Sequence, residues 1–128
     1  MQNEALYVRF QSPEPNWRGH HHGVFALIKG LQQDGVLTPD EEDFRRTSND
    51  WYNANFTDPS TIDPQVYDRE LHPLAAAWFK TSATHLVGRV GGYLEVLAAH
   101  DVECVAVYSD APGIVIYEDD EQVIVKPA

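Results

Sequence analysis

The sequence predicts one α+β domain covering residues 1–128, with the element order β-α-α-β-α-β-β-β and a mixed sheet packed with helices. Three observations support this prediction. Apolar residues alternate at positions 5–11, as in a strand, and recur at helical spacing over 24–35 and 83–101. The last third of the chain resembles consecutive strands that end in a β-hairpin. A chain of 128 residues is long enough for one hydrophobic core but short for two.

The chain begins with a strand, a loop and a helix. The apolar face of the strand at 5–11 consists of Leu6, Val8 and Phe10. Prolines and glycines mark 12–23 as a loop. The helix that follows stops at Gly35, where a helix C-terminal glycine belongs.

A second helix begins with a strong start signal. Thr38 is the expected N-cap, Pro39 is the first helical residue, and Glu41 completes a capping box. A long connection then runs from 57 to 72, with a short helical turn expected after Asp63. Long ordered connections in compact domains are often functional.

The second half contains a short segment, a helix and three strands. The segment 74–80 fits either a helix or a buried strand, and the strand is the prediction. The helix at 83–101 contains three glycines, which let a helix approach a sheet or a ligand closely. The expected strands are 102–109, 114–118 and 122–126, of which the last two form the hairpin. Because both hairpin strands are apolar on both faces, burial on both faces is expected, either under helices or against a second copy in a homodimer.

Composition restricts the classes of partner. The formal net charge is −11, which repels nucleic acids and favours a basic protein partner or a cationic ligand. The chain has no apolar run long enough for a membrane span, and its N-terminus does not resemble a signal peptide. A single cysteine, Cys104, excludes an internal disulfide and fits a cytoplasmic protein. Cys104 itself is expected to be a small core residue.

The segment RGHHHG, residues 18–23, offers two kinds of site. His20 and His22 share a face in an extended chain and could hold a metal together with a distant carboxylate or His72. No HExxH or CxxC spacing accompanies them, so the prediction is no metal and no cofactor. The glycine-containing turn and Arg18 also precede a helix N-terminus, an arrangement that can bind a small anionic ligand.

Two further segments carry candidate residues. Aromatic residues and asparagines alternate near the end of the second helix, namely Asn49, Trp51, Tyr52, Asn53, Asn55 and Phe56. They could line a pocket or a contact surface, whereas the alternative is that Trp51 and Tyr52 belong to the core. The acidic run 118–121 is expected to be a solvated hairpin tip, with Glu118 as a candidate catalytic acid or base.

The sequence carries two resemblances, the first in its C-terminal half. The stretch HPLAAAWFKTSATHLVGRV, followed by LAAH and APGIVIYEDDEQVIVKP, is similar to small bacterial proteins of actinobacterial type. That resemblance implies a cytoplasmic bacterial protein and carries no activity. A looser one is to ADP-ribosyltransferase-like folds, which place an Arg on an early strand and a Glu or Gln on a late one. It implies Arg9 and either Glu118 or Gln122 as candidate catalytic residues.

Two functional hypotheses follow. The first is a small acidic binding or regulatory domain, of a protein-inhibitory or immunity-like kind. The alternative is a small enzyme acting on a phosphorylated or nucleotide-like ligand. A flat acidic surface with an exposed Trp or Tyr would favour the first. A deep pocket that joins Arg9, His20, His22 and Glu118 would favour the second.

Overall fold

The computed structural model describes residues 5–127. Its elements are β1 (Tyr7–Gln11), α1 (Val24–Gln33), α2 (Pro39–Asn55), the 3₁₀ turn η1 (Pro59–Thr61), β2 (Ala76–Lys80), α3 (Thr84–Val87), α4 (Val90–Ala99), β3 (Val105–Ser109), β4 (Ile114–Glu118) and β5 (Gln122–Lys126). The α+β class, the strand at 74–80 and the C-terminal hairpin are confirmed. No helix in this described part of the chain has both the length and the apolar character needed to cross a membrane.

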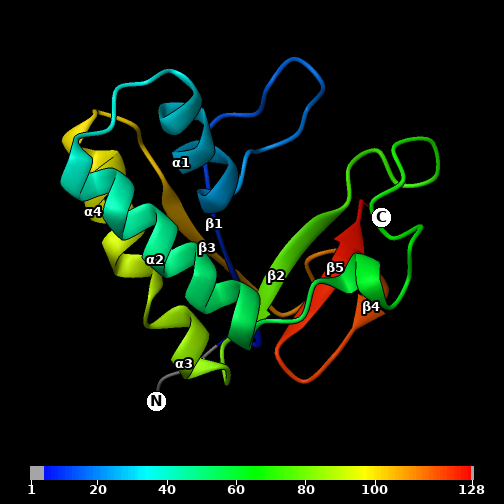
Figure 1. Cartoon of the computed structure of the whole chain (residues 1–128). Helices are drawn as coiled ribbons and strands as arrows, with labels where there is room; N and C mark the ends of the chain where they lie inside the picture. Colours follow the sequence, from blue (N-terminus) through cyan, green and yellow to red (C-terminus); the bar gives the residue numbers. More distant parts are fainter. Residues whose placement is uncertain (1–4, 128) are drawn as a thin grey trace.

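The five strands form one sheet in the order β3-β1-β2-β5-β4 (Figure 1). Every pairing is antiparallel, so the expectation of a mixed sheet is wrong in this detail. The helices α3 and α4 connect β2 to β3, and these two strands do run in the same direction. No parallel pair forms because β1 lies between them and runs opposite to both.

The helices lie on one side of the sheet and enclose the main core (Figure 1). The sheet contributes Val8, Phe10 and Phe79 to this core. A smaller cluster contains Trp78, Val123 and Val125. Because successive side chains of a strand point to opposite faces, Phe79 and its neighbour Trp78 place these two clusters on opposite faces of the sheet.

The two strands of the C-terminal hairpin differ in burial. In β5, residues 122–125 are all buried, as expected from a strand apolar on both faces. In β4, by contrast, Ile114 is 48% exposed and Val115 is 47% exposed. The expectation of burial on both faces is therefore wrong for β4, because this strand forms the outer edge of the sheet and has β5 as its one neighbour.

The helix expected at 83–101 is divided into α3 and α4 at Gly88 and Arg89. At this break the hydroxyl of Tyr52, in α2, donates a hydrogen bond to the carbonyl oxygen of Leu86 at 2.7 Å. That bond supplies a buried partner for a carbonyl group at the end of a helix. This hydrogen bond thus connects the C-terminal part of α2 to α3.

Three other local predictions from the sequence concern a capping box, a glycine at the end of a helix and a turn in the long connection. The capping box at Thr38 is confirmed, since its hydroxyl accepts from the backbone N–H of Glu41 and its own N–H donates to the Glu41 carboxylate. Gly35 has the left-handed backbone (φ 71°) expected after a helix. In the connection 57–72, the Asp58 carboxylate caps η1 by accepting from the N–H of Ser60. A hydrogen-bonded turn also follows Asp63 as expected, since the N–H of Val66 donates to the Asp63 carbonyl oxygen at 3.1 Å.

Candidate functional site

A cavity of about 370 Å³ opens where β1 and β2 diverge. The two strands pair at Tyr7–Lys80 and Val8–Phe79 and no further along, so a gap begins beside Arg9. The start of α1, the end of α2 and the connection 57–72 surround this gap. The residues that line the cavity are Arg9, Phe10, Gly23, Val24, Phe25, Asn49, Tyr52, Asn53, Phe56, Thr57, Asp58, Pro59, Tyr67, Ala77, Trp78, Phe79 and Gln122.

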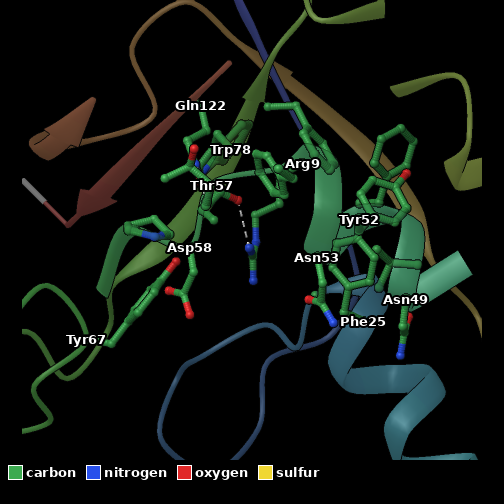
Figure 2. Close-up of a pocket in the computed structure, with 17 residues that line it drawn as sticks. Arg9, Phe25, Asn49, Tyr52, Asn53, Thr57, Asp58, Tyr67, Trp78 and Gln122 are labelled. Atoms are coloured by element: carbon green, nitrogen blue, oxygen red, sulfur yellow. Dashed lines mark hydrogen bonds between the residues drawn. The ribbon is translucent and has the colours of Figure 1, made fainter. Parts of the chain in front are cut away.

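Arg9 crosses the gap between the strands (Figure 2). Its Nη1 donates to the carbonyl oxygen of Ala77 at 2.9 Å, and its Nη2 donates to that of His21 at 2.8 Å. Its Nε donates to Oε1 of Gln11 at 2.9 Å. Burial lowers the pKa of this guanidinium from its ordinary value, because desolvation disfavours the charged form. Among the described residues, the three acceptors that bond to Arg9 are all neutral oxygens.

Gly23 makes room for the Arg9 side chain. A Cβ atom at this position would lie 3.3 Å from Nη2 of Arg9. The loop before Gly23 returns to β1, where the N–H of Ser12 donates to the carbonyl oxygen of His22 at 2.8 Å. The glycine that the sequence places before α1 thus allows the loop to pack against the guanidinium.

The aromatic part of the cavity wall comes mainly from α2, from Phe56 directly after it and from Phe25 in α1. Asn49, Tyr52, Asn53 and Phe56 follow the spacing i, i+3, i+4, i+7 and therefore share one face of the helix. Tyr52 packs edge-on against Phe25, with 5.0 Å between the ring centres. Burial raises the pKa of Tyr52 to about 12, so the hydroxyl stays protonated at neutral pH.

Gln122 is the most buried polar group of the cavity wall and is 1% exposed. Its amide nitrogen donates to the carbonyl oxygen of Thr57 at 2.8 Å and to Oδ2 of Asp119 at 3.0 Å. Both amide N–H groups are used, which leaves Oε1 to accept from another group. Gln122 thereby joins β5 to the start of the long connection and keeps that segment at the edge of the cavity.

The long connection contributes Asp58 and Tyr67. Figure 2 shows both side chains on one side of the Arg9 guanidinium, with Asn53 and Phe25 on the other. Partial burial raises the pKa of Tyr67 to about 12. Oδ1 of Asp58 accepts hydrogen bonds from the backbone N–H and the hydroxyl of Ser60. At neutral pH the Tyr67 hydroxyl is therefore a hydrogen-bond donor, and the Asp58 carboxylate is partly used in holding η1.

The structure brings six of the candidate residues together at the cavity, namely Arg9, Asn49, Tyr52, Asn53, Phe56 and Gln122. Glu118 is not among the lining residues, and its carboxylate forms an ion pair with Lys80 at 2.7 Å. Of the two late-strand residues that the ADP-ribosyltransferase resemblance implies, Gln122 shares the cavity with Arg9.

The candidate side chains of the RGHHHG segment do not line the cavity. Arg18 is exposed and stacks on Trp17, with 5.9 Å between the guanidinium carbon and the ring centre. His20 and His22 face each other edge-on, with 6.2 Å between ring centres. Burial lowers the pKa of His20 from its ordinary value, and the nearby Arg9 adds to this effect. Among residues 5–127, no group of three or more His, Cys, Asp or Glu side chains could hold a metal ion.

Trp51 lies behind the cavity wall, under Arg89. The Arg89 guanidinium carbon is 4.1 Å from the centre of its ring. Trp51 also packs against the main core, and its neighbour Tyr52 is a buried member of that core. The two readings of the aromatic segment thus both apply, since Tyr52 is at once a core residue and a wall of the cavity.

Most carboxylates of the acidic segments 40–43 and 118–121 interact with other groups of the same molecule. Glu41 accepts from Thr38 and interacts with Nε2 of His100 at 2.7 Å, and Glu42 pairs with Arg45 at 2.7 Å. On the hairpin, Glu121 interacts with Nε2 of His85 at 2.6 Å. The Arg45 ion pair offsets the charge of Glu42, whereas hydrogen bonds from neutral imidazoles leave the charges of Glu41 and Glu121 in place.

Sequence reasoning did not single out Asp58, Tyr67 or Trp78. Asp58 and Tyr67 belong to the long connection, where length was the one signal of function. Trp78 lies in a segment that was described by its apolar character alone. The sharper signal was the i, i+3, i+4, i+7 spacing of Asn49, Tyr52, Asn53 and Phe56, which places amides and aromatic rings on one helix face.

Comparison of the chain with protein-family models, with curated proteins and with solved structures gave no match. The fold and the cavity geometry are therefore the basis for any functional conclusion.

Proposed function

We propose that this protein is a small-molecule-binding domain whose ligand occupies the cavity beside Arg9. The observation that supports the proposal is the composition of the cavity wall. A volume of about 370 Å³ is in the range typical of ligand sites, and such sites combine apolar and aromatic walls with a few converging polar groups. Phe25, Tyr52 and Phe56 supply the aromatic wall, and Arg9 and Gln122 are among the polar groups.

The lining residues favour binding over catalysis. Catalysis of proton transfer requires a group whose pKa lies near the working pH. Arg9 stays charged and Tyr52 and Tyr67 stay protonated at neutral pH. No His or Cys is among the lining residues. The cavity therefore has the means to orient a ligand, whereas its one carboxylate, Asp58, is partly engaged in capping η1.

A variant whose cavity is blocked by a larger side chain tests this proposal. Asn53 lies at the exposed rim of the cavity, and its neighbour Ala54 is exposed and is not among the lining residues. Asn53→Trp should obstruct the cavity, and Ala54→Trp adds the same side chain to the same helix without doing so. The probe is 2-naphthamide, a neutral bicyclic amide, followed by amide chemical shifts in two-dimensional NMR.

We expect saturable shifts at Val24, Phe25 and Tyr67 in the native chain and in Ala54→Trp, and their loss in Asn53→Trp. Far-ultraviolet circular dichroism checks that both variants fold. The proposal is wrong if Asn53→Trp binds the probe as the native chain does, or if the native chain shows no saturable shifts with this probe or with its carboxylate and phosphate analogues.

Recognition of a protein partner is a second candidate, which one observation favours. Trp17 is 92% exposed at the loop between β1 and α1, and exposed tryptophans are enriched at protein interfaces. We expect immobilised native protein to retain a polypeptide from the native cell lysate that Trp17→Ala loses. Ile62→Ala, at another exposed apolar residue, is the control. Equal retention by all three baits would contradict this candidate.

A further inference from the structure

Resting on the proposed small-molecule function, we propose that the ligand is a carboxylic acid, and that its carboxylate binds to the guanidinium of Arg9 with the hydroxyl of Tyr67 as a second donor. The rest of the ligand then lies against the aromatic wall formed by Phe25, Tyr52 and Phe56.

Arg9 has unused hydrogen-bonding capacity. A guanidinium has five N–H donors, of which one is on Nε and two are on each terminal nitrogen. Bonds to Gln11, Ala77 and His21 use three of them. The hydrogen bonds found among the described residues leave one N–H free on each terminal nitrogen. Two donors on the two terminal nitrogens are what a bidentate carboxylate contact needs.

The charge of Arg9 also favours an anion. The ion pairs found among residues 5–127 do not include Arg9. A partly buried charge that is bonded to carbonyl and amide oxygens alone retains a strong electrostatic attraction for an anion. A carboxylate that enters the cavity would supply the missing opposite charge in a site partly shielded from water, where the pair interacts more strongly than at the surface.

The charge of the cavity distinguishes a carboxylate from a phosphate ester. The charged groups that line the cavity are Arg9 and Asp58, one of each sign, in a protein of formal net charge −11. With a singly charged carboxylate bound, the charges in the cavity would sum to −1. With a phosphate ester of charge near −2 they would sum to about −2, a larger excess of negative charge beside Asp58. The lining therefore favours the carboxylate over the phosphorylated ligand that the sequence suggested.

Tyr67 is the second donor. Figure 2 shows its side chain beside Asp58, with both on one side of the Arg9 guanidinium, and all three residues line the cavity. The hydroxyl keeps its proton at neutral pH and can donate a hydrogen bond to a carboxylate oxygen. Because it is a neutral donor, its contribution should be smaller than that of the charged Arg9.

The test compares three probes with the same ring system, namely 2-naphthoate, 2-naphthamide and 2-naphthyl phosphate. Dissociation constants come from NMR titrations of the native chain at constant ionic strength. We expect 2-naphthoate to bind at least about tenfold more tightly than 2-naphthamide, since a charge-assisted pair is stronger than a neutral hydrogen bond. We also expect it to bind more tightly than 2-naphthyl phosphate.

Variants of Arg9 and Tyr67 test whether these two residues cause the preference for naphthoate over naphthamide. In Tyr67→Phe the ratio of naphthamide to naphthoate dissociation constants should fall about threefold, because the hydroxyl donates a stronger hydrogen bond to the charged carboxylate than to the amide carbonyl. In Arg9→Gln the ratio should approach one, and in Arg9→Lys, which keeps the charge but lacks the planar donor pair, it should be intermediate. Because Arg9 also joins β1 to β2, the NMR spectrum must show that each variant is folded before its ratio is used. The comparison on the native chain and on Tyr67→Phe does not depend on the Arg9 variants.

The outcomes separate the two proposals. Equal affinity for naphthoate and naphthamide would overturn the carboxylate assignment and leave the small-molecule function intact. Tighter binding of naphthyl phosphate would overturn the choice of carboxylate over phosphate. If none of the three probes binds saturably, both proposals are wrong. An unchanged ratio in folded Tyr67→Phe would remove Tyr67 from the binding site.

Discussion

At the scale of single residues, two neighbouring glycines at the start of α4 have opposite surroundings. A Cβ atom on Gly91 would meet nothing within 4 Å, whereas one on Gly92 would lie 2.5 Å from Cζ of Phe44. At Gly92, the absence of a side chain leaves space in α4 for the Phe44 ring of α2. The sequence shows two equivalent glycines, and their difference arises from the ring of a residue in another helix.

We expect Gly91→Ala to stabilise the protein by up to about 1 kcal/mol, because alanine loses less conformational freedom in a helix. We expect Gly92→Ala to destabilise it by about 1–3 kcal/mol, because the added methyl group displaces the Phe44 ring. Urea denaturation measures both free energies of unfolding. The close contact would be contradicted if both alanines changed the stability in the same direction by a similar amount.

At the scale of elements, the N-terminus of α2 is fixed to the C-terminus of α4 by one carboxylate. Oε1 of Glu41 accepts from the N–H of Thr38 at 2.8 Å and lies 2.7 Å from Nε2 of His100. The hydrogen bond with His100, and next that with the Thr38 backbone, lowers the pKa of Glu41 from its ordinary value of 4.5. The capping box, which is a local signal, therefore also makes a tertiary contact.

The lowered pKa of Glu41 gives a pH dependence with a definite sign. Protonation is harder in the folded state, so the stabilisation is complete above the unfolded-state pKa of about 4.5 and is lost as the pH falls through the lower folded-state pKa. We expect Glu41→Gln to reduce the loss of stability between about pH 5 and pH 3. Urea midpoints measured across this range test it. An acid dependence identical to that of the native chain would show that Glu41 is not coupled to folding.

At the scale of the whole molecule, the net charge of −11 opposes the compact state. Raising the salt concentration from about 10 mM to about 150 mM shortens the screening length from about 30 Å to about 8 Å. At neutral pH we expect the thermal midpoint to rise over this step. Near the isoelectric point of about 4.7 the same step should have little effect. A midpoint that falls with salt at neutral pH would mean that attractive ion pairs outweigh the repulsion.

The sheet topology decides where the cavity lies in the whole molecule. β1 is a central strand that pairs with β3 over its full length and with β2 at two positions. Arg9 fills part of the resulting gap, and the connection 57–72 closes one side of it through the contact between Gln122 and Thr57. The cavity thus depends on residues more than a hundred positions apart in the chain.

By itself, the sequence determined the elements and their caps. The strand periodicity around Val8, the capping box at Thr38 and the glycine after α1 depend on neighbours within a few residues, so short patterns suffice to predict them. The amides and aromatic rings of α2 were recognisable for the same reason. Arg9 and Gln122 were named as candidates, but the sequence alone offered Glu118 as an equal alternative to Gln122.

Tertiary structure decided the rest, because pairing over long distances in the chain depends on register and packing rather than on local preference. The insertion of β1 between β2 and β3 made every pair antiparallel. The break between α3 and α4 is matched by the Tyr52 hydroxyl, which comes from a different helix. Above all, the two-residue pairing of β1 with β2 opened the gap that places Arg9, Tyr67 and Gln122 around one cavity.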